Sequence, residues 1–427
     1  MRLNKPCFPS ITVLLVTALM TVTHAAAQSP TAREKILINF NGTGFAGNAP
    51  TGGLIYDAAG NFYGVTYAGG IKGGYDYGNG TVYELSPAAN GGWKTKSLYR
   101  FRPGSTDGQS PVGGLARDSS GNLYGTTGWG GPNVCTDGYN TATCGTAFEL
   151  SPDGLGGWSE KIIYSFSQKE GWFPTSLIID AAGNLDGTTR YTAKLNSATG
   201  TVFELQRNGE EWTHTVLHTF GEGEDGALPV GPLLFDKAGN LYGATTLGNA
   251  NGYGTVFKLT NTGSGWKEGI VFNFPQASGG SEPNGGLIFD SAGNLYGTTY
   301  VGGTTGCGVA FELTPSNGGS WKQTVLHTFQ CNQNNYLFPE AGLVLDQSGN
   351  LYGTTGFGGS ANWGTLFKLK PSGNGAWTYS VIHTFVGSPG DGVEPNSGLL
   401  LDSKGNLYGT TSGGGAGGGG TLFEITL

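Results

Sequence analysis

The chain has 427 residues, of which 80 are glycine, 12% are aromatic and 12% carry a charge, and its formal net charge is -8. Disordered glycine-rich chains lack regularly spaced aromatic and β-branched residues, which this sequence has, so the composition indicates an all-β protein with many tight turns. The acidic balance argues against nucleic acid or an anionic membrane as a partner.

Residues 1–27 have the features of a secretory signal peptide. Arg2 and Lys5 supply a positive start, residues 11–22 an apolar stretch, and the alanines at 25–27 a cleavage site. The apolar stretch is too short to span a bilayer, and no second one follows. We therefore expect an exported protein, periplasmic or extracellular, without a membrane anchor.

A phrase of Asp, two variable residues, Gly and Asn occurs seven times. Its first residues are Asp57, Asp118, Asp180, Asp236, Asp290, Asp346 and Asp402. They are 61, 62, 56, 54, 56 and 56 residues apart, which is typical of one supersecondary unit per copy. Asp bonds a turn with its side chain and Gly adopts the positive φ that closes it, so the phrase predicts a hairpin turn rather than a calcium loop or catalytic acids.

Each unit contains four segments rich in β-branched and aromatic residues, which in the fifth unit are residues 286–290, 294–299, 309–313 and 321–329. The last unit has only three, and residues 35–40, ahead of the first unit, match the missing fourth segment. The pattern predicts a seven-bladed β-propeller with four strands per blade, closed by the N-terminal strand 35–40 completing the last blade. Residues 28–427 then form one domain, with repeats beginning near residues 52, 113, 176, 231, 285, 341 and 397.

Four cysteines remain once Cys7 leaves with the signal peptide. An even number in an oxidising compartment favours disulfides. Cys135 and Cys144 are close in sequence, and Cys307 and Cys331 lie in loops expected on one face, so we predict the pairs Cys135–Cys144 and Cys307–Cys331. No CxxC or His-rich spacing indicates a metal site, and we expect no cofactor; calcium is an alternative that no motif supports.

Two other repeated rows are interpreted as structural. The His row consists of His218, His327 and His383, whose repeat position holds Ile38, Tyr99, Tyr164 and Phe272 in the other units. A position that accepts Ile or Phe is typical of packing on an outer strand. The Trp row begins the fourth strand and is expected to pack between blades, with carbohydrate stacking as the alternative: Trp93, Trp158, Trp212, Trp266, Trp321 and Trp377.

Function is expected where the copies differ. The loops between second and third strands and the connections between blades should emerge on one face, opposite the Asp turns. Blade two has an enlarged loop with Trp129; in blade three Asp186 replaces the repeated Tyr, and Arg190 and Tyr191 replace a Gly-Gly segment. We treat Asp186, Arg190 and Tyr191 as weak catalytic candidates, beside the simpler interpretation of tolerated substitutions, because no second unpaired acid supports a paired-carboxylate glycosidase.

Acidic residues also cluster near a repeated Pro in the blade connections: Asp225, Glu282, Glu340, Asp391 and Glu394. If the first strand of each blade is innermost, these acids ring the mouth of a central channel. They either tune solubility or, with Trp129, form a binding mouth for a cation-bridged or hydroxyl-rich ligand.

The unit GGLIxDxxGNLYGTTxxGG followed by GTVFEL resembles the tandem repeat of Gloeobacter and Verrucomicrobia, the GloVer repeat, over residues 52–427. The resemblance implies an exported or surface bacterial protein, often with a separate anchoring tail, and it transfers no catalytic residues. Because this chain ends at Leu427 inside the last predicted strand, we expect it to be freely secreted or periplasmic. A shorter likeness of the DxxGNLY phrase to NHL-type and lyase propellers concerns the fold alone.

Three functions fit these observations. We favour a monomeric, non-catalytic binding or scaffold module for an extracellular carbohydrate or a cell-surface partner, because no copy carries a distinct catalytic set. The alternatives are a lyase or hydrolase acting on an extracellular polysaccharide and a purely structural envelope protein.

Overall fold

The computed structural model describes most of the chain. The described residues are 32–41, 47–71, 78–104, 106–136, 141–192, 199–221, 225–248, 252–275, 278–316, 318–332, 335–387 and 390–427. Within these ranges the regular secondary structure is all β-strand. No helix that is long and apolar enough to cross a membrane occurs in them. The expected signal peptide, residues 1–27, lies outside the described residues.

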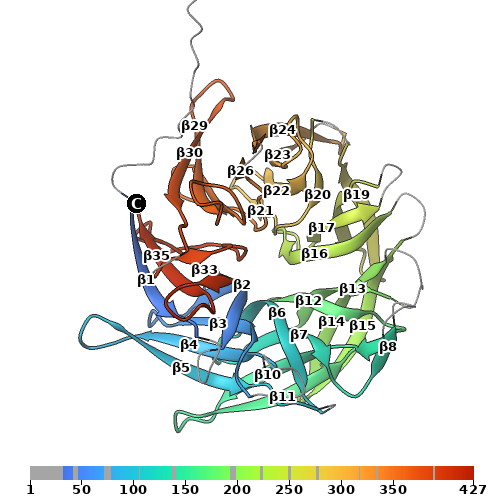
Figure 1. The fold of residues 1–427 in the computed structure, drawn as a ribbon. Helices are drawn as coiled ribbons and strands as arrows, with labels where there is room; N and C mark the ends of the chain where they lie inside the picture. The colour runs from blue at the N-terminus through green and yellow to red at the C-terminus, as the bar shows by residue number, and fades with distance from the viewer. Residues whose placement is uncertain are drawn as a thin grey trace, which may run out of the picture.

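Antiparallel sheets are arranged as blades around a common centre (Figure 1). Blade one consists of β2 (Asn48–Tyr56), β3 (Phe62–Ala68), β4 (Thr81–Pro87) and β5 (Trp93–Arg100). Blade two consists of β6 (Gly108–Arg117), β7 (Leu123–Gly130), β10 (Thr146–Pro152) and β11 (Trp158–Ser165). Blade three consists of β12 (Trp172–Ile179), β13 (Leu185–Tyr191), β14 (Gly200–Asn208) and β15 (Glu211–Phe220). Blade four consists of β16 (Gly226–Phe235), β17 (Leu241–Gly248), β18 (Thr255–Asn261) and β19 (Trp266–Asn273).

The later blades have a shorter or divided first strand. Blade five consists of β20 (Ser281–Pro283) and β21 (Ile288–Phe289), both paired with β22 (Leu295–Val301), then β23 (Val309–Pro315) and β24 (Trp321–Thr328). Blade six consists of β27 (Val344–Leu345), β28 (Leu351–Thr355), β29 (Thr365–Pro371) and β30 (Trp377–Thr384). Blade seven consists of β32 (Leu400–Leu401), β33 (Leu407–Thr411), β35 (Thr421–Thr426) and β1 (Arg33–Asn39). Short pairs lie in loops: β8 (Val134–Thr136) with β9 (Thr141–Thr143), β25 (Cys331–Asn332) with β26 (Asn335–Tyr336), and β31 (Gly392–Val393) with β34 (Gly413–Gly414).

The two ends of the described chain share the sheet of blade seven. β1 pairs with β35 from Arg33 opposite Thr426 to Asn39 opposite Thr421. The seven-bladed, four-stranded, all-β arrangement that the repeats predicted is thus confirmed.

Glycines at the centre let the innermost strands touch through their backbones. An added Cβ on Gly52 would lie 1.8 Å from the carbonyl oxygen of Gly113, and one on Gly113 would lie 2.0 Å from that of Thr175. In blade five, a Cβ on Gly285 would lie 2.5 Å from the carbonyl carbon of Ala341. In blade five the first strand is divided into β20 and β21, although the approach at Gly285 is no closer than at Gly52 or Gly113, which lie inside continuous strands. The strand predicted at 286–290 is only β21.

The repeated Asp phrase forms the predicted turn on the hairpin between first and second strands. Asp290 Oδ1 accepts hydrogen bonds from the N–H groups of Ala292 and Asn294, and Oδ2 accepts them from the Asn294 amide and the Tyr296 hydroxyl. Burial opposes the charge, but these hydrogen bonds outweigh it and hold the pKa of Asp290 below 3.8. This saturated carboxylate is a turn former.

Packing between blades explains two further repeated residues. A Cβ on Gly125 of β7 would lie 2.5 Å from Cζ of Phe148, so the glycine of the Leu-Tyr-Gly phrase makes room for the ring on the third strand. The tyrosine of the same phrase meets the Trp row of the next blade, as in Tyr124 and Trp212, whose ring centroids are 5.8 Å apart. The Trp row packs between blades, as expected.

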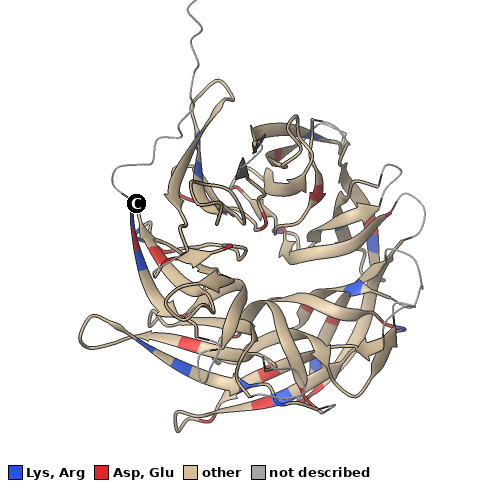
Figure 2. Ribbon diagram, in the orientation of Figure 1, with Lys and Arg blue, Asp and Glu red and all other residues tan. Residues whose placement is uncertain are grey.

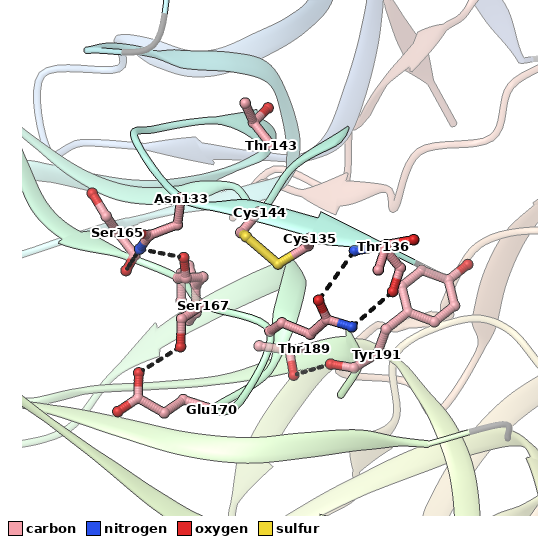
Figure 3. The surroundings of a disulfide bond; sticks show 12 residues. Asn133, Cys135, Thr136, Thr143, Cys144, Ser165, Ser167, Glu170, Thr189 and Tyr191 are labelled. Atoms are coloured by element: carbon pink, nitrogen blue, oxygen red, sulfur yellow. Dashed lines mark hydrogen bonds between the residues drawn. A yellow bond between two sulfur atoms is a disulfide. The ribbon is translucent and has the colours of Figure 1, made fainter. Parts of the chain in front are cut away.

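Both predicted disulfides are present. The Cα atoms are 5.3 Å apart in Cys135–Cys144 and 5.5 Å apart in Cys307–Cys331. The first closes the β8–β9 hairpin, which is also fixed to the connection between blades two and three (Figure 3). There the Gln168 side chain donates to the Thr136 carbonyl at 2.9 Å.

Replacing Gly113 by Ala should lower the free energy of unfolding by more than about 3 kcal/mol, because the strain of an L-residue at φ +71° adds to the clash with Thr175. Gly154 is the control: its φ is +72°, but nothing lies within 4 Å of an added Cβ, so Gly154→Ala should cost about 1–2 kcal/mol. Urea unfolding followed by tryptophan fluorescence measures both. Equal losses would contradict a close backbone contact at the axis.

Candidate functional site

Charge alone does not mark a functional face, because acidic and basic residues are interspersed over the blades (Figure 2). Backbone conformation distinguishes one face of the ring of blades. The residue before the repeated Pro is a non-glycine with φ of 52° to 57° in six blade connections: Ala49, Ser110, Phe173, Leu228, Glu282 and Glu394. Phe338 holds the same place in the remaining connection. We call these seven residues and their immediate surroundings the mouth. A left-handed backbone at a non-glycine residue costs about 1–3 kcal/mol and is found most often at functional sites.

Contacts with the preceding blade hold this conformation. The N–H of Glu282 donates to the Tyr253 carbonyl at 3.0 Å, and the N–H of Leu228 donates to the Thr199 carbonyl at 2.8 Å. The ring of Pro283 lies 2.7 Å from the place a Cβ would take on Gly254. The Pro thus docks on a glycine of the preceding blade. Since the backbone makes these contacts, the side chain at the mouth is free to differ from blade to blade.

A pocket of about 370 Å³ opens at the mouth between blades three, four and five. It is lined by Arg190, Leu228, Thr246, Leu247, Glu282, Asn284 and Tyr300. Its volume is at the lower end of the range for small-molecule sites. A guanidinium, a carboxylate, an amide and a phenol converge there beside aliphatic surface, so the pocket suits a small ligand with several polar groups.

Acids continue from the pocket toward blade seven. Burial raises the pKa of Tyr300, and the charges of Glu340 and Glu282 raise it further. Burial also raises the pKa of Glu340, and the charge of Glu394 adds to it. Glu394 accepts a hydrogen bond from the Ser412 hydroxyl at 3.1 Å. The structure therefore brings Glu282, Glu340 and Glu394, three of the five acids expected at the mouth, into one electrostatic neighbourhood.

A cluster of aromatic side chains lies next to Arg190, one of the residues that line the pocket. The ring centroid of Trp129 lies 5.0 Å from that of Phe173, which lies 6.2 Å from that of Tyr191. The guanidinium carbon of Arg190 lies 5.9 Å from the Tyr191 centroid. Arg190 therefore joins this cluster to the pocket. Its Nε is buried and has no hydrogen-bond partner within the described ranges.

Asp225 and Asp391, the other two acids expected at the mouth, contact histidines of outer strands. Asp225 Oδ2 lies 2.9 Å from Nε2 of His218 on the outer strand β15, and Asp391 Oδ1 lies 3.8 Å from Nε2 of His383 on the outer strand β30. A connection runs from the outer strand of one blade to the inner strand of the next, so its first acid meets outer strands. The His row consequently does more than pack, because two of its members face acids.

Asp186 is not part of the pocket lining. It is 2% exposed, and burial, followed by the charges of Glu204 and Asp180, raises its pKa to about 8. It lies four residues from Arg190 on β13, about 13 Å of extended strand. No hydrogen bond or ion pair joins these two residues in the described part of the chain. The three weak catalytic candidates therefore do not meet in one site: Arg190 and Tyr191 lie at the mouth, and Asp186 lies near the Asp180 turn.

The buried Asp186 should make stability depend on pH. Its folded pKa is raised above the value of 3.8, so its contribution is present below pH 4 and is lost as the pH rises through about 8. In Asp186→Asn this loss disappears, so the variant should gain several kcal/mol relative to wild type between pH 4 and pH 8, at ~1.4 kcal/mol for each unit by which the pKa is raised. Urea unfolding at both pH values measures the gain. An unchanged difference between variant and wild type would contradict it.

Several site residues were not predicted from the sequence, among them Leu228, Asn284 and Tyr300. The sequence does contain a signal for Leu228, because the residue before the repeated Pro changes from blade to blade while the Pro is retained. Asn284 and Tyr300 carry no such signal, since only the fold brings their positions to Arg190.

These features define the class of protein: a seven-bladed β-propeller with a ligand-sized pocket in its mouth. The chain belongs to the Gloeobacter/Verrucomicrobia repeat family, whose model matches residues 133–337 and 290–427. No curated protein sequence matches it.

Solved structures with a similar fold share little sequence with it. A protein from Lactobacillus plantarum is 14% identical, covers 81% of this chain and 88% of its own, and superposes with a TM-score of 0.52. A candidate 6-phosphogluconolactonase from Bacteroides uniformis is 13% identical, with the same coverage and a TM-score of 0.50. A candidate oxidoreductase (glucose dehydrogenase) from Thermus thermophilus is 15% identical and covers 73% of this chain and 95% of its own, with a TM-score of 0.41. At these identities the likeness concerns the fold alone.

Proposed function

We propose that this protein is an exported, monomeric binding module that holds a hydroxyl-rich ligand, such as an extracellular carbohydrate, at its mouth. The observation that carries the proposal is the pocket among Arg190, Glu282 and Tyr300, which is built from side chains that differ between blades on a shared backbone. Two disulfides support export, because they persist in oxidising compartments.

The chemistry of the lining supports a ligand rich in hydroxyl groups. Glu282 accepts hydrogen bonds from hydroxyls, Arg190 donates to their oxygens, and Asn284 does both. Tyr300 stacks on Phe338 with ring centroids 4.9 Å apart, which gives the pocket a fixed aromatic edge. An aromatic face beside convergent polar groups suits the alternating apolar and polar surfaces of a sugar ring.

Cleavage of the ligand is a second candidate function, and one observation favours it. Glu340 is a half-buried acid whose pKa is raised by burial and by the charge of Glu394, and a carboxyl with a raised pKa can act as a proton donor. In this case Glu340→Gln would abolish turnover of a bound polysaccharide and leave its binding intact. A binding module shows no turnover in either form.

A panel of plant and bacterial polysaccharides, tested with and without calcium, identifies the ligand. Arg190→Ala and Tyr300→Ala should each weaken binding at least ~10-fold in titration calorimetry, because each removes a converging group worth about 1.4 kcal/mol or more. The matched controls are Arg117→Ala and Tyr56→Ala, which change exposed residues directly before an Asp turn. Unchanged binding in the first pair, or equal losses in the second pair, would contradict a site at the mouth.

We also propose that β1 closes the ring of blades. Ile38 and Phe40 are 6% and 0% exposed, and they pack with Leu422 of blade seven and Leu54 of blade one. The N-terminal segment thereby links the last blade to the first.

A chain that begins at Asn41 should have a free energy of unfolding about 3–6 kcal/mol lower than that of a chain that begins at Ala32. The lost burial of Ile38 and Phe40 alone accounts for this difference. Differential scanning calorimetry compares the two. Identical melting would show that β1 does not close the ring.

A further inference from the structure

The outer strands of neighbouring blades meet through one repeated pair of positions. The His row faces the residue two places after the start of the next blade's fourth strand. His327 stacks on Tyr379 in this way, with ring centroids 4.0 Å apart and planes at 2°. At the junction of blades six and seven, the same arrangement places His383 of β30 against Glu34 of β1, in neighbouring blades (Figure 1).

Asp391 adds a third ligand-type side chain at this junction. His383 Nε2 lies 3.4 Å from Glu34 Oε2 and 3.8 Å from Asp391 Oδ1, and the three ligand atoms all lie within 4.8 Å of one another. The Asp391 carboxylate is oriented by the N–H groups of Val386, at 2.6 Å, and Gly392, at 2.7 Å. Each of its oxygens retains a free lone pair.

Two buried atoms at this junction lack hydrogen-bond partners, although His383 Nε2 lies within ion-pair distance of both carboxylates. Glu34 Oε1 and His383 Nε2 are shielded from solvent and accept or donate no hydrogen bond within the described ranges. Glu160 and Glu268, at the same repeat position, also have a buried Oε1 without a hydrogen-bond partner, so an ion is indicated here by the spacing of the three ligand atoms. The side chains of Glu34 and His383 are each 16% exposed, which leaves an ion a short path from solvent.

The equivalent junction between blades three and four provides an internal comparison. It also carries a His, an Asp and a Glu: His218, Asp225 and Glu268. There His218 Nε2 already lies at hydrogen-bond distance from Asp225, 2.9 Å, and Glu268 does not complete a group of three. The same residue types therefore form a hydrogen-bonded His–Asp pair at one junction, where Glu268 Oε1 also lacks a hydrogen-bond partner, and a group of three at ligand spacing at the other.

We propose that Glu34, His383 and Asp391 bind a divalent transition-metal ion of the Zn²⁺ type, which ties the N-terminal strand to blade six. One imidazole nitrogen and two carboxylate oxygens are ligands that Zn²⁺ accepts, and bonds of about 2.0–2.2 Å in a tetrahedral site separate its ligands by about 3.3–3.6 Å. The observed 3.4 and 3.8 Å require little rearrangement. Ca²⁺ prefers six to eight oxygens, and this site has an imidazole and few oxygens. Water would take the fourth position.

Metal-free protein prepared with a chelator should bind one Zn²⁺ in titration calorimetry and melt at a higher temperature with the metal, because the ion binds the folded state alone. Co²⁺ should give the visible absorption of a four-coordinate site with one nitrogen ligand. Glu34→Gln and His383→Gln should weaken Zn²⁺ binding by more than the ~10–100-fold that the loss of a second-layer partner costs. His218→Gln, the matched control, should bind as wild type does.

The outcomes separate three cases. Binding lost in the Glu34 and His383 variants and kept in His218→Gln supports the site. Wild type that binds neither Zn²⁺ nor Co²⁺ overturns it and leaves an ion-pair cluster. Binding that persists in folded Glu34→Gln and His383→Gln, as checked by circular dichroism, places the metal elsewhere and also overturns the proposal. If either variant fails to fold, the Co²⁺ spectrum of wild type still decides, since absorption of six-coordinate type contradicts the triad.

Discussion

Backbone contact at the axis is the constraint on which the rest of the structure depends. The innermost strands approach so closely that a Cβ on Gly52 or Gly113 would overlap a carbonyl of the next blade. With this spacing fixed, six blade connections dock their Pro on a glycine of the preceding blade, and the residue before each of these prolines has a left-handed backbone. The position of the mouth therefore follows from backbone packing, and its chemistry follows from the side chains placed on that backbone.

The two faces of the molecule differ in how fully their polar side chains are hydrogen-bonded. On one face, the Asp carboxylates are saturated by hydrogen bonds from their own turns, as at Asp290, and have little capacity left for a ligand. At the mouth, Arg190 keeps an unpartnered Nε, and Glu340 has a pKa raised by burial and by its acidic neighbour. Unsatisfied groups around a pocket favour binding there.

The fold could be predicted from the sequence because every copy of the repeat carries the same pattern of turn and strand residues. The Asp-x-x-Gly-Asn turn, the strands that it joins and the cysteine pairs are set by residues near one another in sequence or in the repeat. Radial position was harder to predict: Asp225 and Glu282 both lie in blade connections, but only the path of the chain shows that the first meets an outer strand and the second reaches the mouth.

Contacts between residues far apart in the sequence could not be predicted from the repeat pattern. Glu34 and His383 are separated by most of the chain, and the His row, taken alone, is typical of packing. The separation of Asp186 from Arg190 was, by contrast, within reach of strand geometry, since four residues of extended chain span about 13 Å.

In the proposed function, the mouth binds the ligand and the Asp-turn face does not. A crystal structure of the protein soaked with the oligosaccharide that binds most tightly in the polysaccharide panel tests it directly. Sugar density is expected between Arg190, Glu282 and Tyr300. Density confined to the Asp-turn face or to the outer edges of the blades would contradict it.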